Sequence, residues 1–345
     1  MRRTRRKREK YKKKIIVISV FLFLIIMTSG YAAFSTNISL HAKGNIKCHP
    51  EIAKDKLLKT LTTVGDGLYK DEYEAGRYVY KGASPNNYID LNDETYRIVS
   101  LESDNTIKVI KEKSIGTMKY DSKNTRYSTN KNDYCNAQNG CNAWANNKTT
   151  LDKSGQNISK ITDGLNDILL DLPNQDSYLN SYLNNSWYNT LDNQIKEIID
   201  NHIFYIGPLL YDKKIIQSLE TDISQEKEYR WNGKIGLINV TDFVKASNNP
   251  DCTSVMDHND ATYKCYNDIE YNYLIIKEGF QWQWLLNPYG ASNNMHEYVW
   301  NVGYDGRIGA NSASNSYQVR PTFYIKSNIK LCGNGTLSNP YTITD

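Results

Sequence analysis

Four common enzyme signatures are missing from this sequence. It has no Gly-x-Ser-x-Gly elbow, no His-Glu-x-x-His pair, no phosphate-binding Walker loop and no dinucleotide-binding glycine fingerprint. These absences argue against the hydrolase, metalloprotease, nucleotide-binding and dehydrogenase classes that carry those motifs. The Asp and Glu residues also single out no glycosidase pair. We therefore predict no catalytic residue, no cofactor and a non-enzymatic function.

Residues that could hold a metal ion are also few. The sequence lacks Cys-x-x-Cys spacing, and its histidines form no cluster with cysteines, so it predicts no zinc site. The loop 251–260 contains three acids and Asn259 but lacks the Asp-x-Asp-x-Asp-Gly spacing of a calcium loop, which favours a solvated acidic loop. We predict no bound metal. The five histidines are scattered: His41, His49, His202, His258 and His296.

The positive charge is concentrated at the N-terminus. Residues 1–14 hold ten Lys or Arg and one acid, so they carry +9, and the rest of the +4 chain carries −5. A negatively charged body argues against nucleic-acid binding. Residues 15–34 follow as an apolar run. As a helix, residues 15–33 would rise roughly 28 Å, which just spans a bilayer core.

The basic block is expected to be a cytoplasmic tail, which places the rest of the chain outside the cell membrane. Residues 15–34 are then either a single-pass transmembrane anchor or a cleaved signal segment. Gly30 and Ala32 supply small residues at the −3 and −1 positions of a cleavage site. Both alternatives predict an extracellular C-terminal domain, which is secreted if the segment is cleaved.

Six cysteines fit an oxidising compartment, where disulfides persist. Proximity in the sequence predicts that Cys135 pairs with Cys141 and that Cys252 pairs with Cys265. Cys48 and Cys332 remain as further disulfide candidates. Six cysteines allow fifteen connectivities, so the sequence alone leaves the pairing open.

The pattern along the chain predicts a stalk or linker at 35–77 and one folded domain at 78–345, with no internal repeat. β-rich runs at 95–101 and 106–111 predict a hairpin. Apolar spacing predicts helix from Leu179 to Ile203, and a capped short helix at 241–246. Residues 119–160 are expected to be a long loop. Strands are expected at 233–239, 282–286, 297–302 and 318–325, which gives an α+β fold.

Four motifs in order resemble a known group of domains. They are Tyr96-Arg-Ile-Val99, Ser177-Tyr-Leu-Asn-Ser-Tyr-Leu-Asn184, Trp284-Leu-Leu-Asn-Pro288 and Val319-Arg-Pro-Thr-Phe-Tyr-Ile325. The group consists of uncharacterised extracytoplasmic domains of Gram-positive, low-GC bacteria, and it is distantly similar to the C-type-lectin-like fold of formylglycine-generating, sulfatase-modifying proteins. The resemblance covers residues 78–345. It implies a lectin-like mixed domain with long loops stapled by disulfides.

The formylglycine-generating enzymes hold copper on a pair of cysteines near the end of the domain. The late cysteines of this chain lack that spacing, so the resemblance does not imply oxidase activity. It implies a surface-exposed protein that recognises a glycan, a peptide or another cell-surface ligand. The alternatives are a cell-wall-associated enzyme and a structural component of an extracellular matrix.

Aromatic residues near the C-terminus are the candidate ligand-binding residues: Trp282, Trp284, Tyr298 and Trp300. Because side chains two apart on a strand share a face, Trp282 and Trp284 should both be exposed or both be buried. Arg320 is expected to hydrogen-bond the backbone where the strand at 318–325 begins.

Overall fold

Strands outnumber helices in this fold, and the helices are short. The computed structural model describes residues 48–136, 138–162, 168–210, 218–258, 265, 268–276, 281–290 and 296–344. They belong to one unit, Cys48–Asp345, which is distinct from Met1–Lys47. The architecture is mixed helix and strand, as the sequence predicts.

No helix in the described part of the chain is both long enough and apolar enough to cross a bilayer. The predicted cytoplasmic tail 1–14, the anchor or signal segment 15–34 and the stalk residues 35–47 lie outside the described residues.

The predicted stalk is wrong for residues 48–77, which are part of the folded unit. They form β1 (Glu51–Ile52), α2 (Ala53–Leu58) and β2 (Gly67–Lys70). Ala53, Leu57 and Leu68 are completely buried. The strand β1 pairs with residues near the C-terminus, and such a distant partner leaves no local signal in the sequence.

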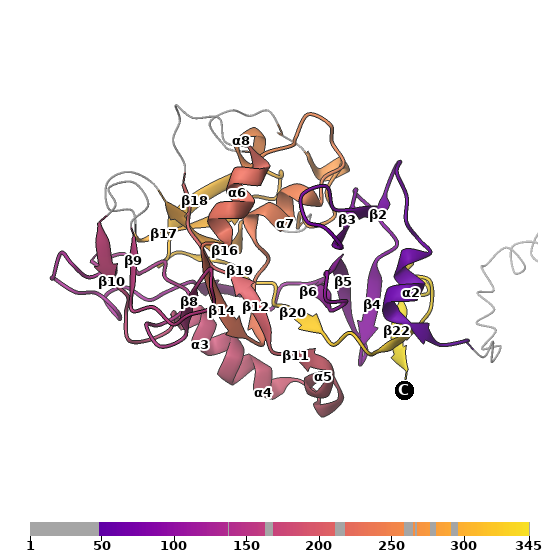
Figure 1. The fold of residues 1–345 in the computed structure, drawn as a ribbon, viewed down its shortest axis with the longest axis horizontal. Helices are drawn as coiled ribbons and strands as arrows, with labels where there is room; N and C mark the ends of the chain where they lie inside the picture. The colour runs from indigo at the N-terminus through magenta and orange to yellow at the C-terminus, as the bar shows by residue number, and fades with distance from the viewer. Residues whose placement is uncertain are drawn as a thin grey trace, which may run out of the picture. The chain divides into compact units, whose positions relative to one another are not determined.

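The largest sheet interleaves strands from both ends of the unit. Its order within the described residues is β1-β21-β22-β4-β5-β6-β20-β11, with β2 and β3 branching from β5 and with β15 on β20. Figure 1 shows the late strands β20 and β22 beside the early strands β4 to β6. The remaining bounds are β3 (Tyr78–Lys81), β4 (Tyr88–Leu91), β5 (Glu94–Leu101), β6 (Ile107–Lys111), β11 (Ile199–Asp200), β15 (Ile235–Gly236), β20 (Thr322–Ile325), β21 (Lys330–Cys332) and β22 (Tyr341–Thr344).

The predicted hairpin is confirmed by β5 and β6. They pair antiparallel, with Ile98 opposite Val109. Asn105 in the connecting turn has a φ of 71°, a left-handed conformation that Asn tolerates better than most residues. β6 in turn pairs antiparallel with β20, so it lies between β5 and β20.

A second sheet carries the C-terminal aromatic segment. Its order is β18-β17-β16-β19-β7, with β13 added on β16. Two smaller sheets, β12-β14-β8 and β10-β9, complete the described strands. The bounds are β7 (Thr117–Lys119), β8 (Thr150–Asp152), β9 (Lys160–Thr162), β10 (Leu169–Asp171), β12 (His202–Tyr205), β13 (Leu209–Leu210), β14 (Tyr229–Gly233), β16 (Gln283–Gly290), β17 (Tyr298–Val302), β18 (Ile308–Ser312) and β19 (Ser316–Gln318).

The predicted central helix exists but ends earlier than its apolar spacing suggests. α3 (Tyr178–Ser181), a π-helical turn at Tyr182–Trp187 and α4 (Tyr188–Thr190) run on from one another, and α5 (Asn193–Ile198) follows. The prediction of helix up to Ile203 is wrong for 199–203. Those residues enter β11 and β12, where β-branched isoleucines suit sheet pairing as well as a helix face.

Three helices gather at the opposite end of the view from α3–α5 (Figure 1). They are α6 (Leu219–Glu226), α7 (Val240–Lys245) and α8 (Val255–His258). The short capped helix predicted at 241–246 is confirmed as α7, where Asn239 and Asp242 form a capping box. The described part of 119–160 is mostly irregular, as predicted, apart from β8 and the strand ends at 119 and 160.

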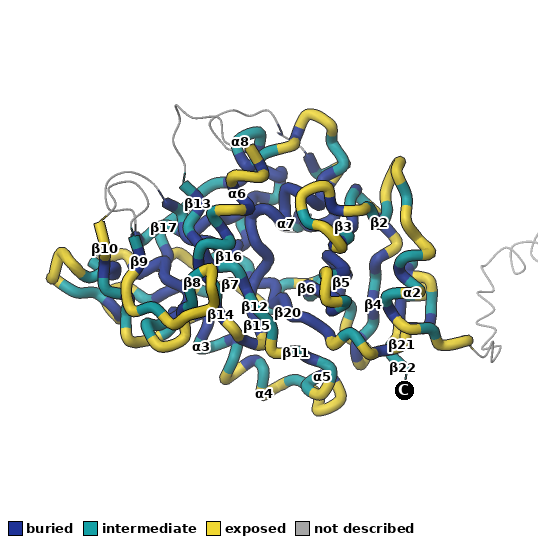
Figure 2. The backbone as a smooth tube through the Cα atoms, in the orientation of Figure 1, coloured by how far each residue is buried: buried dark blue, intermediate teal, exposed yellow. Residues whose placement is uncertain are grey.

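Both disulfides predicted from proximity are present, Cys135–Cys141 and Cys252–Cys265. The remaining candidates, Cys48 and Cys332, form a third. Buried residues follow the central strands of the two large sheets, and exposed residues lie on the loops around them (Figure 2).

Candidate functional site

The aromatic residues predicted to bind ligand do not form an exposed face. Trp284 and Trp300 are 0% and 1% exposed, while Trp282 and Tyr298 are half-buried. The indole N–H of Trp284 donates to the carbonyl of Met118 at 2.9 Å. These two tryptophans therefore belong to the core, and the prediction that they contact a ligand is corrected.

The shared-face argument fails because Trp282 precedes the strand. β16 begins at Gln283, and residues 283–288 are all buried, so no face of this segment is open to solvent. Trp282 instead lies against Gly303 and Gly309, where its ring is within 3.5 Å of the place a Cβ would take. One tryptophan of the pair is buried and the other is half-buried.

Two cysteines and a histidine approach one another near α8. Cys252, His258 and Cys265 place their ligand atoms within 4.8 Å of one another. The two sulfurs form a disulfide, so neither is available as a thiolate ligand. His258 Nε2 lies 3.3 Å from Oδ2 of Asp268, which orients the ring within the core.

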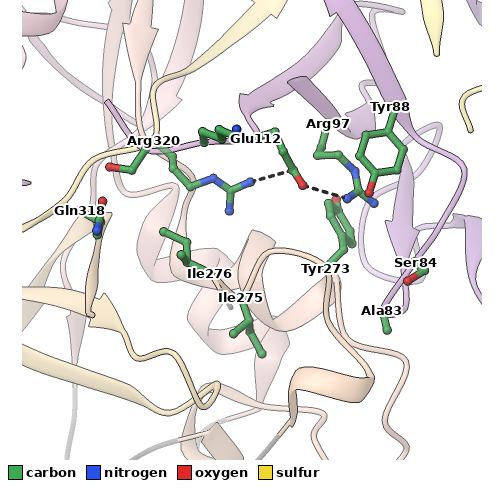
Figure 3. Close-up of a pocket in the computed structure, with 12 residues that line it drawn as sticks. Ala83, Ser84, Tyr88, Arg97, Glu112, Tyr273, Ile275, Ile276, Gln318 and Arg320 are labelled. Carbon is green, nitrogen blue, oxygen red and sulfur yellow. Dashed lines mark hydrogen bonds and ion pairs between the residues drawn. The ribbon is translucent and has the colours of Figure 1, made fainter. Parts of the chain in front are cut away.

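A pocket of about 500 Å³ lies at one end of β5, β6 and β20. Figure 3 shows Arg97 and Arg320 approaching Glu112 from opposite sides. Its wall combines cationic, hydroxyl, amide and aliphatic groups. The lining residues are Ala83, Ser84, Tyr88, Arg97, Glu112, Lys113, Ser114, Tyr273, Ile275, Ile276, Gln318 and Arg320.

Sheet pairing explains why Arg97, Glu112 and Arg320 meet. Ile110 of β6 is opposite Arg97 on one neighbouring strand and opposite Thr322 on the other. Arg320 stands just before β20, and Glu112 stands just beyond the end of β6. The backbone N–H of Glu112 donates to the carbonyl of Thr95 at 3.0 Å, which fixes the start of the loop. The two arginines thus flank the end of a single strand.

Arg97 is 3% exposed and is held on several sides. Its guanidinium carbon lies 3.8 Å from the ring centre of Tyr88 and 4.8 Å from that of Tyr273. Its Nε donates to Oδ1 of Asn87 at 2.5 Å. Such stacking and hydrogen bonding fix the plane of the guanidinium before any ligand arrives.

Arg320 is 2% exposed and bonds mostly to backbone. Its Nε donates to the carbonyl of Lys111 at 2.7 Å, and Nη1 donates to that of Leu274 at 2.9 Å. The expected backbone role of Arg320 is confirmed. Burial lowers its pKa to about 10, and Glu112 opposes that shift only in part.

Glu112 is the counterion of both arginines. Its Oε1 lies 3.5 Å from Nη1 of Arg97, and its Oε2 lies 3.5 Å from Nη2 of Arg320. The side chain retains 30% of its exposure, so solvent reaches it from the pocket. The two guanidinium groups thus share one partly exposed carboxylate at the pocket wall.

Two acids with raised pKa values lie on α6 and do not line this pocket. Burial raises the pKa of Glu226 to about 8, although Thr241 donates to both carboxylate oxygens. Burial likewise raises the pKa of Asp222 to about 7. Both residues pack where α6 meets α7 and α8, so they concern the stability of the fold.

Sequence reasoning missed Arg97 and Glu112 as site residues and gave Arg320 only a backbone role. The available signal was that two motifs, Tyr96-Arg-Ile-Val99 and Val319-Arg-Pro321, each contain an arginine, the first inside an apolar strand and the second just before one. Nothing in their spacing shows that both strands pair with β6. Lys113 and Tyr273 stand in segments without a motif.

A family model described as "Domain of unknown function (DUF6273)" matches residues 173–327. The matched segment contains Tyr273 and Arg320, whereas Arg97 and Glu112 lie before it. No curated protein and no solved structure matches the chain.

Proposed function

We propose that this chain is a non-enzymatic recognition protein of the bacterial cell surface. Its folded unit binds a glycan, a peptide or another surface ligand in the pocket between Arg97 and Arg320. The observation that carries the proposal is the fixed pair of buried guanidinium groups that share Glu112 at the wall of a pocket of about 500 Å³. A pocket of that volume is within the range of small-ligand sites.

The arginines are prepared for binding because their positions are set by the protein. Arg97 is stacked on Tyr88, and Arg320 is bound to two backbone carbonyls. The two arginine side chains therefore lose little conformational entropy when a ligand binds, which favours affinity. This arrangement replaces the aromatic face, Trp282 to Trp300, as the binding surface.

The placement outside the cytoplasm rests on the basic block 1–14 and the apolar segment 15–34. Three disulfides support it, because such bonds persist in oxidising compartments. The relation to C-type-lectin-like domains of Gram-positive bacteria remains part of this proposal, supported by a mixed fold with two loops closed by disulfides. The pocket is what supports binding, because a shared fold does not by itself imply a shared function.

The test is a screen of glycans and isolated cell walls with the protein from residue 35 onward, which retains Cys48. Ser84 is exposed at the pocket, so Ser84→Trp should block it and abolish binding. Ser338 is exposed in the loop between β21 and β22, so Ser338→Trp is the matched control and should bind normally. Equal binding by both variants would remove the pocket as the binding site.

A further inference from the structure

Cationic side chains outnumber carboxylates among the described residues that line the pocket. Arg97, Arg320 and Lys113 are cationic, and Glu112 is the single carboxylate among these described residues. Both guanidinium groups are nearly completely buried. A buried charge is unfavourable unless it is paired, so two arginines that share one carboxylate create a demand for a further anion.

The geometry leaves room for that anion. Each arginine is 3.5 Å from Glu112, whereas a well-seated charge-assisted hydrogen bond measures about 2.7–2.9 Å. The guanidinium of Arg320 has five N–H donors. Among the described residues, three of these donors have an acceptor, one each on Nε, Nη1 and Nη2. Burial lowers the pKa of this guanidinium to about 10, in agreement with incomplete pairing.

The rest of the wall suits a small polyhydroxy molecule. Ser84 and Gln318 supply hydroxyl and amide groups, and Tyr88 stands at the opposite side of the pocket from Gln318 (Figure 3). Such groups donate to and accept from sugar hydroxyls. An exposed cation, Lys113, adds long-range attraction for an anion.

The neighbouring strands are unsuited to an extended peptide. Peptides that add to a sheet need an open strand edge. β5 already pairs with β4 and β6, and β20 already pairs with β6, β11 and β15. Within the described residues, β5 and β20 therefore have no free edge to offer.

We propose that the ligand of this pocket is a carboxylated sugar, with its carboxylate bound by Arg320 and Lys113 and its hydroxyls bound by Ser84 and Gln318. This inference rests on the proposed function and names the ligand class of the same site. The Arg97–Glu112 pair forms the fixed wall beside the bound carboxylate. A peptide with a free C-terminal carboxylate is the competing source of the same chemistry, and the test separates the two.

The experiment titrates the full chain, purified in detergent, with two matched pairs of probes. Glucuronate and glucose differ at the carboxylate, and N-acetyl-dialanine and its amide differ in the same way. We expect glucuronate to bind at least about tenfold more tightly than glucose, and the preference to shrink as salt is raised. Neither peptide should bind as well as glucuronate.

Two substitutions, Lys113→Gln and Glu112→Gln, change the charge of the pocket while both arginines remain in the chain. Lys113→Gln should weaken glucuronate binding about threefold to tenfold at low salt, while Lys119→Gln, an exposed lysine on β7, should leave it unchanged. Glu112→Gln should strengthen glucuronate binding, because it removes the competing carboxylate. Unfolding midpoints of each variant are measured alongside, so that loss of fold is recognised as such.

Each remaining outcome decides against one proposal or both. Equal affinity for glucuronate and glucose, both lost in Ser84→Trp, would overturn the carboxylate inference and keep the pocket. If N-acetyl-dialanine binds more tightly than its amide and neither sugar binds, the site is assigned to a peptide C-terminus. If none of the four probes binds but the protein still binds cell walls, this inference alone is overturned. If neither the probes nor cell walls bind, the proposed function is overturned too.

Discussion

Cys48 and Cys332 are joined by a disulfide, although 284 positions separate them in the sequence. Their Cα atoms lie 5.7 Å apart, where the start of the folded unit meets β21. Cys135–Cys141, in contrast, closes a sequence separation of only 6. The three bonds therefore constrain the unfolded chain to very different extents.

Replacing Cys48 and Cys332 together by serine should lower the free energy of unfolding by about 2–5 kcal/mol. The corresponding loss for Cys135 and Cys141 should be smaller, because the entropy removed from the unfolded chain grows with loop length. Urea unfolding of the two double variants, with peptide mapping under non-reducing conditions, measures this order. A larger loss from the short loop would contradict it.

Asp242 holds a buried network of charges together. Its Oδ1 accepts from Nη2 of Arg77 at 2.8 Å, and its Oδ2 accepts from Nζ of Lys108 at 2.6 Å. Asp242→Asn removes the carboxylate that pairs with Lys108, whereas Arg77 keeps its ion pairs with other carboxylates. The substitution should lower the free energy of unfolding by about 3–5 kcal/mol. Asp93→Asn on an exposed turn is the control, and its effect should stay within about 0.5 kcal/mol.

The same network predicts an acid limit to stability. Burial opposes ionisation of Asp242 and Glu74, but Lys108, Arg77 and Lys245 outweigh it and hold the pKa of Asp242 well below its usual range and that of Glu74 at about 2. Because these folded-state pKa values are depressed, their contribution is present above about pH 4 and is lost as pH falls towards 2. Unfolding free energies measured between pH 5 and pH 2 should fall steeply, and a flat profile would refute the assignment.

Glu226 should act in the opposite direction. Its pKa is raised to about 8, so its contribution to stability is complete below the unfolded value of about 4.3 and is lost as pH rises through 8. Glu226→Gln should remove part of the decline between pH 5 and pH 8.5. Glu220→Gln, exposed on the same helix, should not. Urea midpoints at the two pH values make the comparison.

Replacing each of the three tryptophans of the C-terminal segment should lower the free energy of unfolding by an amount that depends on how far that tryptophan is buried. Trp284→Ala and Trp300→Ala should each lower the free energy of unfolding by about 3–5 kcal/mol, as for other buried aromatics. Trp282→Ala should lower it less, by about 1–2 kcal/mol, because its ring is half-buried. If Trp282→Ala instead abolished ligand binding at unchanged stability, the aromatic face would have to be restored as the site.

Protease added to intact cells should remove the folded unit and leave at most a small stub containing residues 1–34. The expectation follows from the ten basic residues before the apolar segment. Immunoblots against tags at each end of the chain give the readout, and lysed cells are the control for protease access. Full protection in intact, protease-accessible cells would reverse the topology.

Local patterns in the sequence predicted the elements whose partners are close along the chain. The β5–β6 hairpin, α7 with its capping box and the two short-range disulfides all belong to this group. The errors arose where distant pairing decides the structure. Ile199 and Ile203 continue the spacing of a helix face, yet Ile199 pairs with Ile325 in a sheet, and residues 51–52 pair with β21.

The candidate site was missed for the same reason. Arg97, Glu112 and Arg320 meet only because β6 has β5 on one side and β20 on the other. The tryptophans attracted attention because exposed aromatics often bind sugars, but period-two spacing cannot reveal a strand that is buried on both faces. The arginines within or just before apolar strands carried the more useful signal.

The pairing of β22 with β4 also constrains when this protein can fold. During synthesis, β4 is made about 250 residues before β22, an interval of roughly 10–50 s at typical translation rates. If the chain leaves the cell as proposed, its early strands cross the membrane first and must wait outside with unpaired edges, which are prone to aggregate. On that proposal folding is completed after translocation, and a holding factor on the outer side of the membrane would raise the yield of folded protein.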